Sequence, residues 1–241
     1  MPIREQIHGM KNEIGVALAI FRTTKNPFSY CLFRMHLAKS AALLPKFGNA
    51  SELLLRRGSA EITYMGKNLV FEYNTGALRF VPLALGEIFT HESYKNLKVK
   101  GRGVVDVGAS IGDTAAYFIS KGARKVYCFD TDVYRLAVLK RNLRRNKYLQ
   151  YAEIFHSQFD RRKLKLKGRT NVLKVDCEGC EYALFDPKGP HLAYIASTFG
   201  QIAMEYHNGE AAIRRALESH GYSVNVNRAS STIGILYASK R

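Results

Sequence analysis

Two acidic side chains stand at points where hydrophobic runs give way to turns. Asp106 closes a run of β-branched residues, and Gly108 and Gly112 follow it. Asp130 ends a second hydrophobic run, at 126–130. Glycines in such a turn let a ligand approach the backbone, and the amides of a helix start face outward. The spacing predicts a nucleotide-type ligand at the edge of a sheet.

The first turn lacks the features that hold phosphates. A dinucleotide loop needs a middle glycine, where this chain has Ser110, and no Gly-Lys-Ser/Thr follows to make a Walker loop. An acid at Asp106 would repel a pyrophosphate, but it suits a ligand that carries an ammonium and a sulfonium. Together with the acid at Asp130 and the antiparallel hairpin expected at the end of the sheet, this loop favours S-adenosylmethionine as the ligand.

Asp130 is placed to accept hydrogen bonds from both ribose hydroxyls of an adenosine. The alternative is that Asp130 or Thr131 only caps the helix that follows. At the tip of the third strand, Ser157 and Gln158 could bind the adenine edge, and Phe159 could pack on the base. The expected cofactor residues are Asp106, Gly108, Ala109, Ser110, Gly112, Asp113, Asp130, Thr131, Ser157 and Gln158.

A second dense group of polar residues follows the fourth expected strand. Lys174 and Asp176 share one side of that strand, because side chains alternate, and Asp176 lies at its carboxyl tip. A lysine buried in a strand needs a carboxylate partner, so we expect an ion pair between Lys174 and one of the acids at 176–181. Glu178 and Glu181 could instead form a solvent-facing helix cap.

Glu205 and His207 end the fifth expected strand on one shared side. Methyl transfer to a hydroxyl needs an aligned acceptor and a group that removes its proton. The expected catalytic residues are Asp176, Lys174, Glu178, Glu205 and His207. Their carboxylates could also hold a divalent cation; we assign no metal ligands.

The slot after the fourth strand also bears on the acceptor atom. Enzymes that methylate exocyclic amines typically carry an Asn/Asp-Pro-Pro-aromatic turn there, whereas this chain has Asp-Cys-Glu-Gly at 176–179. The similar Asn-Pro-Phe at 26–28 lies far upstream. The sequence therefore favours oxygen over amino nitrogen as the acceptor.

Cys177 and Cys180 have the spacing of a redox pair or of half a zinc site. No second such pair and no spaced histidine pair completes a structural zinc site. Four cysteines in 241 residues do not make a disulfide framework, and the expected setting is a reducing cytoplasm.

The expected elements place these residues on one α/β domain. We predict strands near 103–107, 125–130, 151–156, 171–176, 200–206, 222–227 and 232–238, with helices near 112–121, 132–146, 180–186 and 209–220. Such alternation predicts a mainly parallel seven-stranded sheet whose last two strands form an antiparallel hairpin.

A smaller accessory region is expected at 1–83, before a cofactor-binding domain at 84–241. It combines helical pieces over 1–47 with strands near 61–64, 69–73 and 77–81, and a helix over 83–97 leads into the domain. No stretch approaches the roughly 20 apolar residues that span a bilayer.

The net charge of +17 is high for a chain with 24% charged residues. Twelve lysines and arginines lie between Arg135 and Arg169, against Glu153 and Asp160. This excess could serve an anionic partner such as RNA, or it could be a solvated basic surface.

Three segments resemble the FkbM family of S-adenosylmethionine-dependent methyltransferases. They are Gly-Glu-Ile-Phe at 86–89 leading to Tyr94, the run at 105–115, and Lys-Val-Asp-Cys-Glu-Gly-Cys-Glu at 174–181. The resemblance covers about 85–240 and implies a Rossmann-like class I methyltransferase domain that O-methylates sugars or secondary metabolites. Asp130 stands where many members carry glutamate.

Three functions stay open at this point. A small-molecule or glycan O-methyltransferase leads, and an RNA methyltransferase is the alternative that the charge motivates. A non-catalytic binding module of the same fold is the third, although the intact acids and glycines argue against it.

Overall fold

The computed structural model describes residues 50–56, 59–72, 84–90, 92–166, 171–228 and 232–240. The chain divides into two compact units, Met1–Ser93 and Tyr94–Arg241. The helical pieces expected over 1–47 and the strand expected over 77–81 lie outside the described residues.

The first unit contains a three-stranded antiparallel sheet. Its strands are β1 (Ala50–Arg56), β2 (Ser59–Tyr64) and β3 (Lys67–Glu72), in that order. Met65 and Gly66 join β2 to β3, both with positive φ, as a two-residue hairpin turn requires. The strands expected near 61–64 and 69–73 are confirmed as β2 and β3.

The helix expected over 83–97 is wrong in its extent. Helical backbone covers only 84–90, with a π-helical turn at Gly86–Thr90. Glu92 has a φ of 49°, which a right-handed helix cannot contain. The chain then turns, and the amide of Ser93 donates to the carbonyl oxygen of Glu87 at 3.2 Å.

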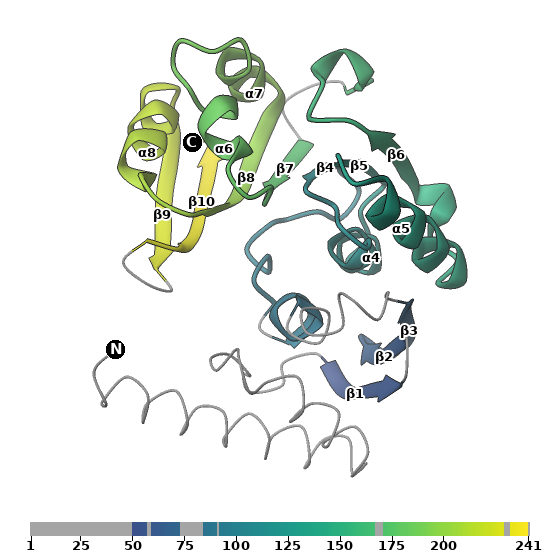
Figure 1. The fold of residues 1–241 in the computed structure, drawn as a ribbon. Coiled ribbons are helices and arrows are strands. Elements are labelled where there is room, and N and C mark those ends of the chain that lie inside the picture. The colour runs from purple at the N-terminus through teal and green to yellow at the C-terminus, as the bar shows by residue number, and fades with distance from the viewer. Residues whose placement is uncertain are drawn as a thin grey trace, which may run out of the picture. The chain divides into compact units, whose positions relative to one another are not determined.

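The second unit is a seven-stranded sheet in the order β6-β5-β4-β7-β8-β10-β9 (Figure 1). The strands are β4 (Gly103–Val107), β5 (Lys125–Asp130), β6 (Ala152–His156), β7 (Asn171–Val175), β8 (Phe199–Tyr206), β9 (Tyr222–Arg228) and β10 (Gly234–Lys240). β10 is antiparallel to both of its neighbours, and the other pairs are parallel. The predicted sheet is confirmed.

The described part of this unit contains five α-helices that pack beside the sheet, together with short 3-10 turns at Leu149–Tyr151 and Arg161–Lys163. The helices are α4 (Asp113–Ser120), α5 (Val133–Arg145), α6 (Cys180–Leu184), α7 (Leu192–Thr198) and α8 (Glu210–Ser219). Figure 1 shows α4 and α5 beside the half of the sheet that contains β4–β6, and α6, α7 and α8 beside the other half.

The sequence did not predict α7. Leu192, Ile195 and Ala196 are buried, at the i, i+3, i+4 spacing of an amphipathic helix. Its seven residues begin without a side-chain cap, so only packing against the sheet fixes this helix.

The arrangement of strands brings three loops to one edge of the sheet. From β4 the chain continues to β5 on one side and later reaches β7 on the other. Ligands of open α/β sheets bind outside the carboxyl ends of the strands at such a switch point. Every residue of β4 and β7 is buried, so these strands form a firm base for the loops. Among the described residues no helix has the length and apolarity to cross a lipid bilayer.

Candidate functional site

The loop between β4 and α4 is a tight turn that requires glycine. Gly108 and Gly112 have φ values of 80° and 85°. A Cβ atom on Gly108 would lie 1.7 Å from the carbonyl oxygen of Asp176, so a larger residue must push the two loops apart. The amides of Gly108 and Ala109 donate to the carbonyl oxygen of Phe129 at 2.9 and 3.1 Å. The loop is thus held against both neighbouring strands.

Asp106 lies behind this loop, with its side chain fully buried. The Thr114 hydroxyl donates to Oδ2 at 2.6 Å, and Nζ of Lys174 lies 3.0 Å from Oδ1. Lys174 also donates to the carbonyl oxygen of Gly108 at 2.9 Å. Asp106 therefore acts through the loop that it positions, and its carboxylate does not reach the sheet edge.

The expected ion pair of Lys174 is present. Asp176 lies 3.7 Å from Nζ, but Asp106, on a different strand, is nearer. Burial by itself lowers the pKa of Lys174, and the charges of Asp106 and Asp176 outweigh burial and raise it. Asp113 opens α4 beside this group, and burial raises its pKa to about 6.

Asp130 ends β5 at the same edge. Its Oδ2 accepts from the amide of Ser110 at 2.9 Å, and its Oδ1 accepts from the amide of Asp132 at 2.9 Å. The cap of α5 is Asp132, which accepts from the amides of Tyr134 and Arg135. The alternative that Asp130 or Thr131 caps α5 is therefore wrong. Asp130 links the tip of β5 to the glycine loop.

The tip of β6 carries Ser157 and Gln158 beside a hollow of about 470 Å³. The amide of Ser157 donates to the carbonyl oxygen of Asp130 at 3.0 Å, so this tip adjoins the β5 loop. Phe159 is buried and packs on Phe129 with ring centroids 5.7 Å apart. Phe159 also lines the hollow, so its packing against an adenine stays a prediction.

The loop after β7 lies against the glycine loop. The amide of Asp176 donates to the carbonyl oxygen of Val107 at 3.0 Å. A disulfide joins Cys177 to Cys180, and the two residues between them have positive φ. This single disulfide closes a short loop with two residues between its cysteines. As expected from the sequence, it does not form a disulfide framework.

His207, directly after β8, meets three carboxylates. Its Nδ1 lies 3.3 Å from Oε1 of Glu181, and its Nε2 lies 3.3 Å from Glu178 and 3.9 Å from Glu205. Burial lowers the pKa of His207, but the bond to Glu181 and the charges of Glu178 and Glu205 raise it overall. Because both ring nitrogens face carboxylates, the protonated ring fits this site.

The structure thus forms two groups from the expected catalytic residues. Lys174 and Asp176 lie beside the glycine loop, and Glu178, Glu205 and His207 form a separate acid–histidine cluster. Glu181 also belongs to the cluster and was not in the expected set. It is fully buried and accepts from the amide of Gly179 at 2.8 Å, so it is not a solvent-facing cap.

Glu181 could have been found as the last acid of the Lys-x-Asp-x-Glu-Gly-x-Glu motif. Among the described residues, no three or more His, Cys, Asp or Glu side chains are arranged to hold a metal ion.

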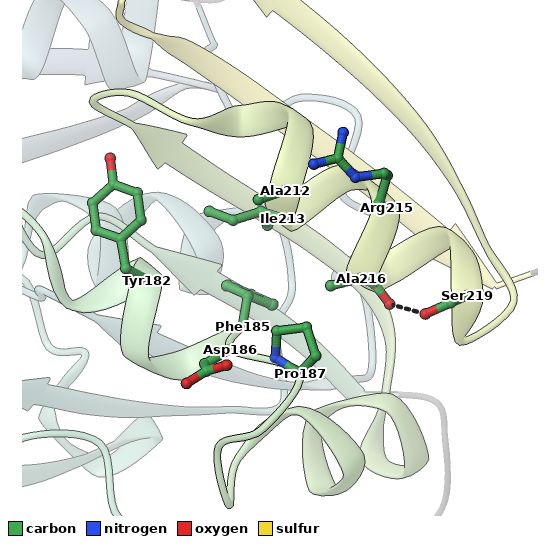
Figure 2. Close-up of a pocket in the computed structure, with 9 residues that line it drawn as sticks. All are labelled: Tyr182, Phe185, Asp186, Pro187, Ala212, Ile213, Arg215, Ala216 and Ser219. Carbon is green, nitrogen blue, oxygen red and sulfur yellow. Dashed lines mark hydrogen bonds between the residues drawn. The ribbon is translucent and has the colours of Figure 1, made fainter.

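A further hollow, of about 490 Å³, lies between α6, the segment after it, and α8. Figure 2 shows Tyr182, Phe185 and Pro187 on one side and Ile213 and Arg215 on the other. None of the expected site residues lines it, so it takes no part in the site at the strand ends.

Comparisons with known proteins address the fold. No model of a known protein family and no curated protein sequence matches the chain. Magnesium protoporphyrin IX methyltransferase from Synechocystis PCC 6803, solved with bound S-adenosylmethionine, aligns with a TM-score of 0.50 and 14% identity over 70% of this chain and 86% of its own. A candidate S-adenosylmethionine-dependent methyltransferase from Listeria monocytogenes aligns with a TM-score of 0.50 and 13% identity, over 66% and 99%. At this identity the likeness concerns architecture, and the chain has the Rossmann-like fold of class I methyltransferases.

Proposed function

We propose that the protein is an S-adenosylmethionine-dependent methyltransferase that acts on a hydroxyl group of a sugar or another small molecule. One observation carries the proposal: a glycine loop, Asp130 and Asp176 meet at the carboxyl ends of three neighbouring strands. The motif at 174–181 supports membership of the FkbM family.

The residues at this edge fit the cofactor. Each oxygen of Asp130 accepts one amide and retains lone pairs for ribose hydroxyls. The close approach at Gly108 holds the glycine loop against the backbone of the loop after β7. Lys174 is engaged by Asp106, so it offers no free cation to a pyrophosphate. The edge therefore suits an uncharged ribose joined to a cationic group.

The bound cofactor supplies a methyl group on a sulfonium, which a nucleophilic oxygen can attack in line. The chain must then align the acceptor and remove its proton. Asp176 is half-buried at the edge and takes the role of base, because its backbone contacts the cofactor loop and its carboxylate lies 3.7 Å from Nζ of Lys174, which donates to Gly108. The raised pKa of His207 favours its protonated form, which would orient Glu178 and Glu205 toward acceptor hydroxyls.

The acids also bear on the acceptor's charge. Asp176, Glu178 and Glu205 are all accessible to solvent at this edge. Carboxylates accept hydrogen bonds from hydroxyl groups and repel phosphates at short range. This favours a neutral polyol over an anionic acceptor.

RNA is the second candidate acceptor, and α5 is the observation that favours it. This helix contains no acidic residue, and Lys140, Arg144 and nearby Lys147 are exposed. Binding through such a surface weakens steeply as salt is added, with a slope of nearly one unit per phosphate contact. A binding constant for RNA that is flat between low and physiological salt would rule this candidate out.

The proposal is tested with labelled S-adenosylmethionine and a panel of sugars, glycosides and short RNAs. We expect label on a hydroxyl-bearing small molecule. Asp176→Asn should lower turnover by about two orders of magnitude or more while cofactor affinity changes little. Asp130→Ala should instead weaken cofactor binding. Cofactor binding without transfer to any acceptor would favour the non-catalytic binding module.

A further inference from the structure

The bond between Cys177 and Cys180 lies within the site itself. We propose that this pair is a reversible redox site, which takes a dithiol as its reductant and sets how firmly the cofactor loop is held. The effect on catalysis rests on the proposed function, but the chemistry at the two sulfur atoms does not.

The bond holds an unusual backbone. Glu178 has a φ of 55° and Gly179 a φ of 118°, and both lie between the bonded cysteines. A residue with a side chain rarely keeps a positive φ unless its surroundings impose it. The covalent ring supplies this constraint, so reduction lets Glu178 return to ordinary backbone angles.

The ring is in contact with the cofactor loop. A Cβ atom on Gly108 would lie 1.7 Å from the carbonyl oxygen of Asp176 and 3.3 Å from Cα of Cys177. The amide of Asp176 is bonded to Val107, which leads into the same loop. Because the glycine loop and the loop after β7 are already in contact, a change in the backbone of the disulfide ring shifts the glycine loop.

The ring also holds the acid–histidine cluster. Glu178 reaches Nε2 of His207 at 3.3 Å from its left-handed backbone position. Glu181 accepts from the amide of Gly179 and lies 3.8 Å from Sγ of Cys177. Opening the ring therefore changes the contacts of both carboxylates with His207.

The bonded cysteines lie at the margin of the core. Cys177 and Cys180 are half-buried, and the residues between them, Glu178 and Gly179, are exposed, so a small reductant has a route to this loop. Cys128, in β5, is buried and free. Disulfides in a reducing compartment are typically transient, catalytic or sensory, and accessible ones exchange fastest.

The exchange is balanced in atoms and electrons. A thiolate of the dithiol attacks one sulfur, the bond between Cys177 and Cys180 breaks, and the released sulfur takes up a proton. The second thiol of the reductant then attacks the mixed disulfide. The reductant leaves as a cyclic disulfide, and the second cysteine is released as a thiol. Two electrons and two protons pass to the protein, which now carries two thiols.

The first experiment follows the sulfur atoms in the full chain. The protein is equilibrated with oxidised or reduced dithiothreitol, alkylated with iodoacetamide, and mapped by mass spectrometry. We expect Cys177 and Cys180 to be unmodified after oxidation and both alkylated after reduction. Full alkylation of both residues in the oxidising buffer would overturn the proposal.

The second experiment titrates each form with S-adenosylhomocysteine by calorimetry. We expect the reduced form to bind roughly fivefold more weakly. This factor corresponds to the lower end of the free-energy cost of holding one residue in the left-handed conformation. The Cys177→Ser/Cys180→Ser double variant should show the weaker affinity in both buffers. Equal affinities of the oxidised and reduced parent would contradict the proposal.

Hydrogen exchange separates this proposal from the proposed function. If S-adenosylhomocysteine binds neither form, the proposed function fails, and exchange of the amides of Gly108, Asp176 and Gly179 still reports on the ring. We expect faster exchange at these amides after reduction in the parent and no change in the double variant. Unchanged exchange in the parent would overturn the redox proposal by itself.

Discussion

Replacing Lys174 with methionine should destabilise the fold more than any surface change. Its side chain is 1% exposed, and its ammonium group lies 3.0 Å from Asp106 and donates to Gly108. Methionine fills a similar volume but leaves the fully buried carboxylate of Asp106 without a counter-charge. Removing one partner of a buried pair costs about 3–5 kcal/mol of unfolding free energy.

The loss should depend on pH in a defined direction. In the parent, the raised pKa of Lys174 keeps its contribution complete below the unfolded value of about 10.4. In Lys174→Met, the isolated Asp106 has a raised folded pKa, so its protonated form favours the fold. The deficit should therefore be smaller near pH 5 and larger near pH 8.

Urea unfolding followed by circular dichroism measures the effect, with two matched variants. Lys125→Met removes a lysine of neighbouring β5 whose Nζ lies 3.8 Å from Glu153, a partly exposed pair, and should cost less than about 1 kcal/mol. Adding Asp106→Asn to Lys174→Met should restore part of the stability, because no buried charge then remains. A deficit below about 1 kcal/mol for Lys174→Met, or no gain in the double variant, would refute the reasoning.

Three further changes test the loops around the site. Gly108→Ala should weaken S-adenosylhomocysteine binding roughly tenfold or more, because left-handed strain adds to the contact with Asp176, whereas Gly101→Ala has a similar φ and open space and should not. Asp132→Ala should lower stability by about 1 kcal/mol through loss of the α5 cap, as thermal unfolding would show; an equal loss in Thr131→Ala would contradict that assignment. His207 has a raised pKa, so its contribution is complete below about pH 6.5 and is lost as pH rises through the folded value. A pH series of unfolding midpoints should show this loss in the parent and not in His207→Gln; parallel curves would disprove it.

The fold could be predicted because the signals are local. β4 was expected at 103–107 and is Gly103–Val107, since buried β-branched runs bounded by glycine identify a parallel strand. The antiparallel end of the sheet followed from two alternating runs near the end of the chain. α7 was missed because only its tertiary packing, and no cap, defines it.

The sequence predicts at which edge of the sheet the site lies. It does not predict which side chains contact one another there. Asp130 and Asp176 were assigned to strand ends correctly, because topology alone fixes that edge, whereas Asp106 lies inside β4 and is fully buried. That Asp106 turns inward depends on Lys174, which is distant in sequence. The link between Glu181 and His207 spans 26 residues, and no local pattern announces it.

Calorimetric titration of the full chain with S-adenosylhomocysteine tests the central claim most directly. We predict one binding site per chain with a micromolar dissociation constant, and loss of that binding in Asp130→Ala with the fold intact by circular dichroism. Absence of binding by the folded parent, or unchanged binding in Asp130→Ala, would contradict the assignment of this edge to the cofactor.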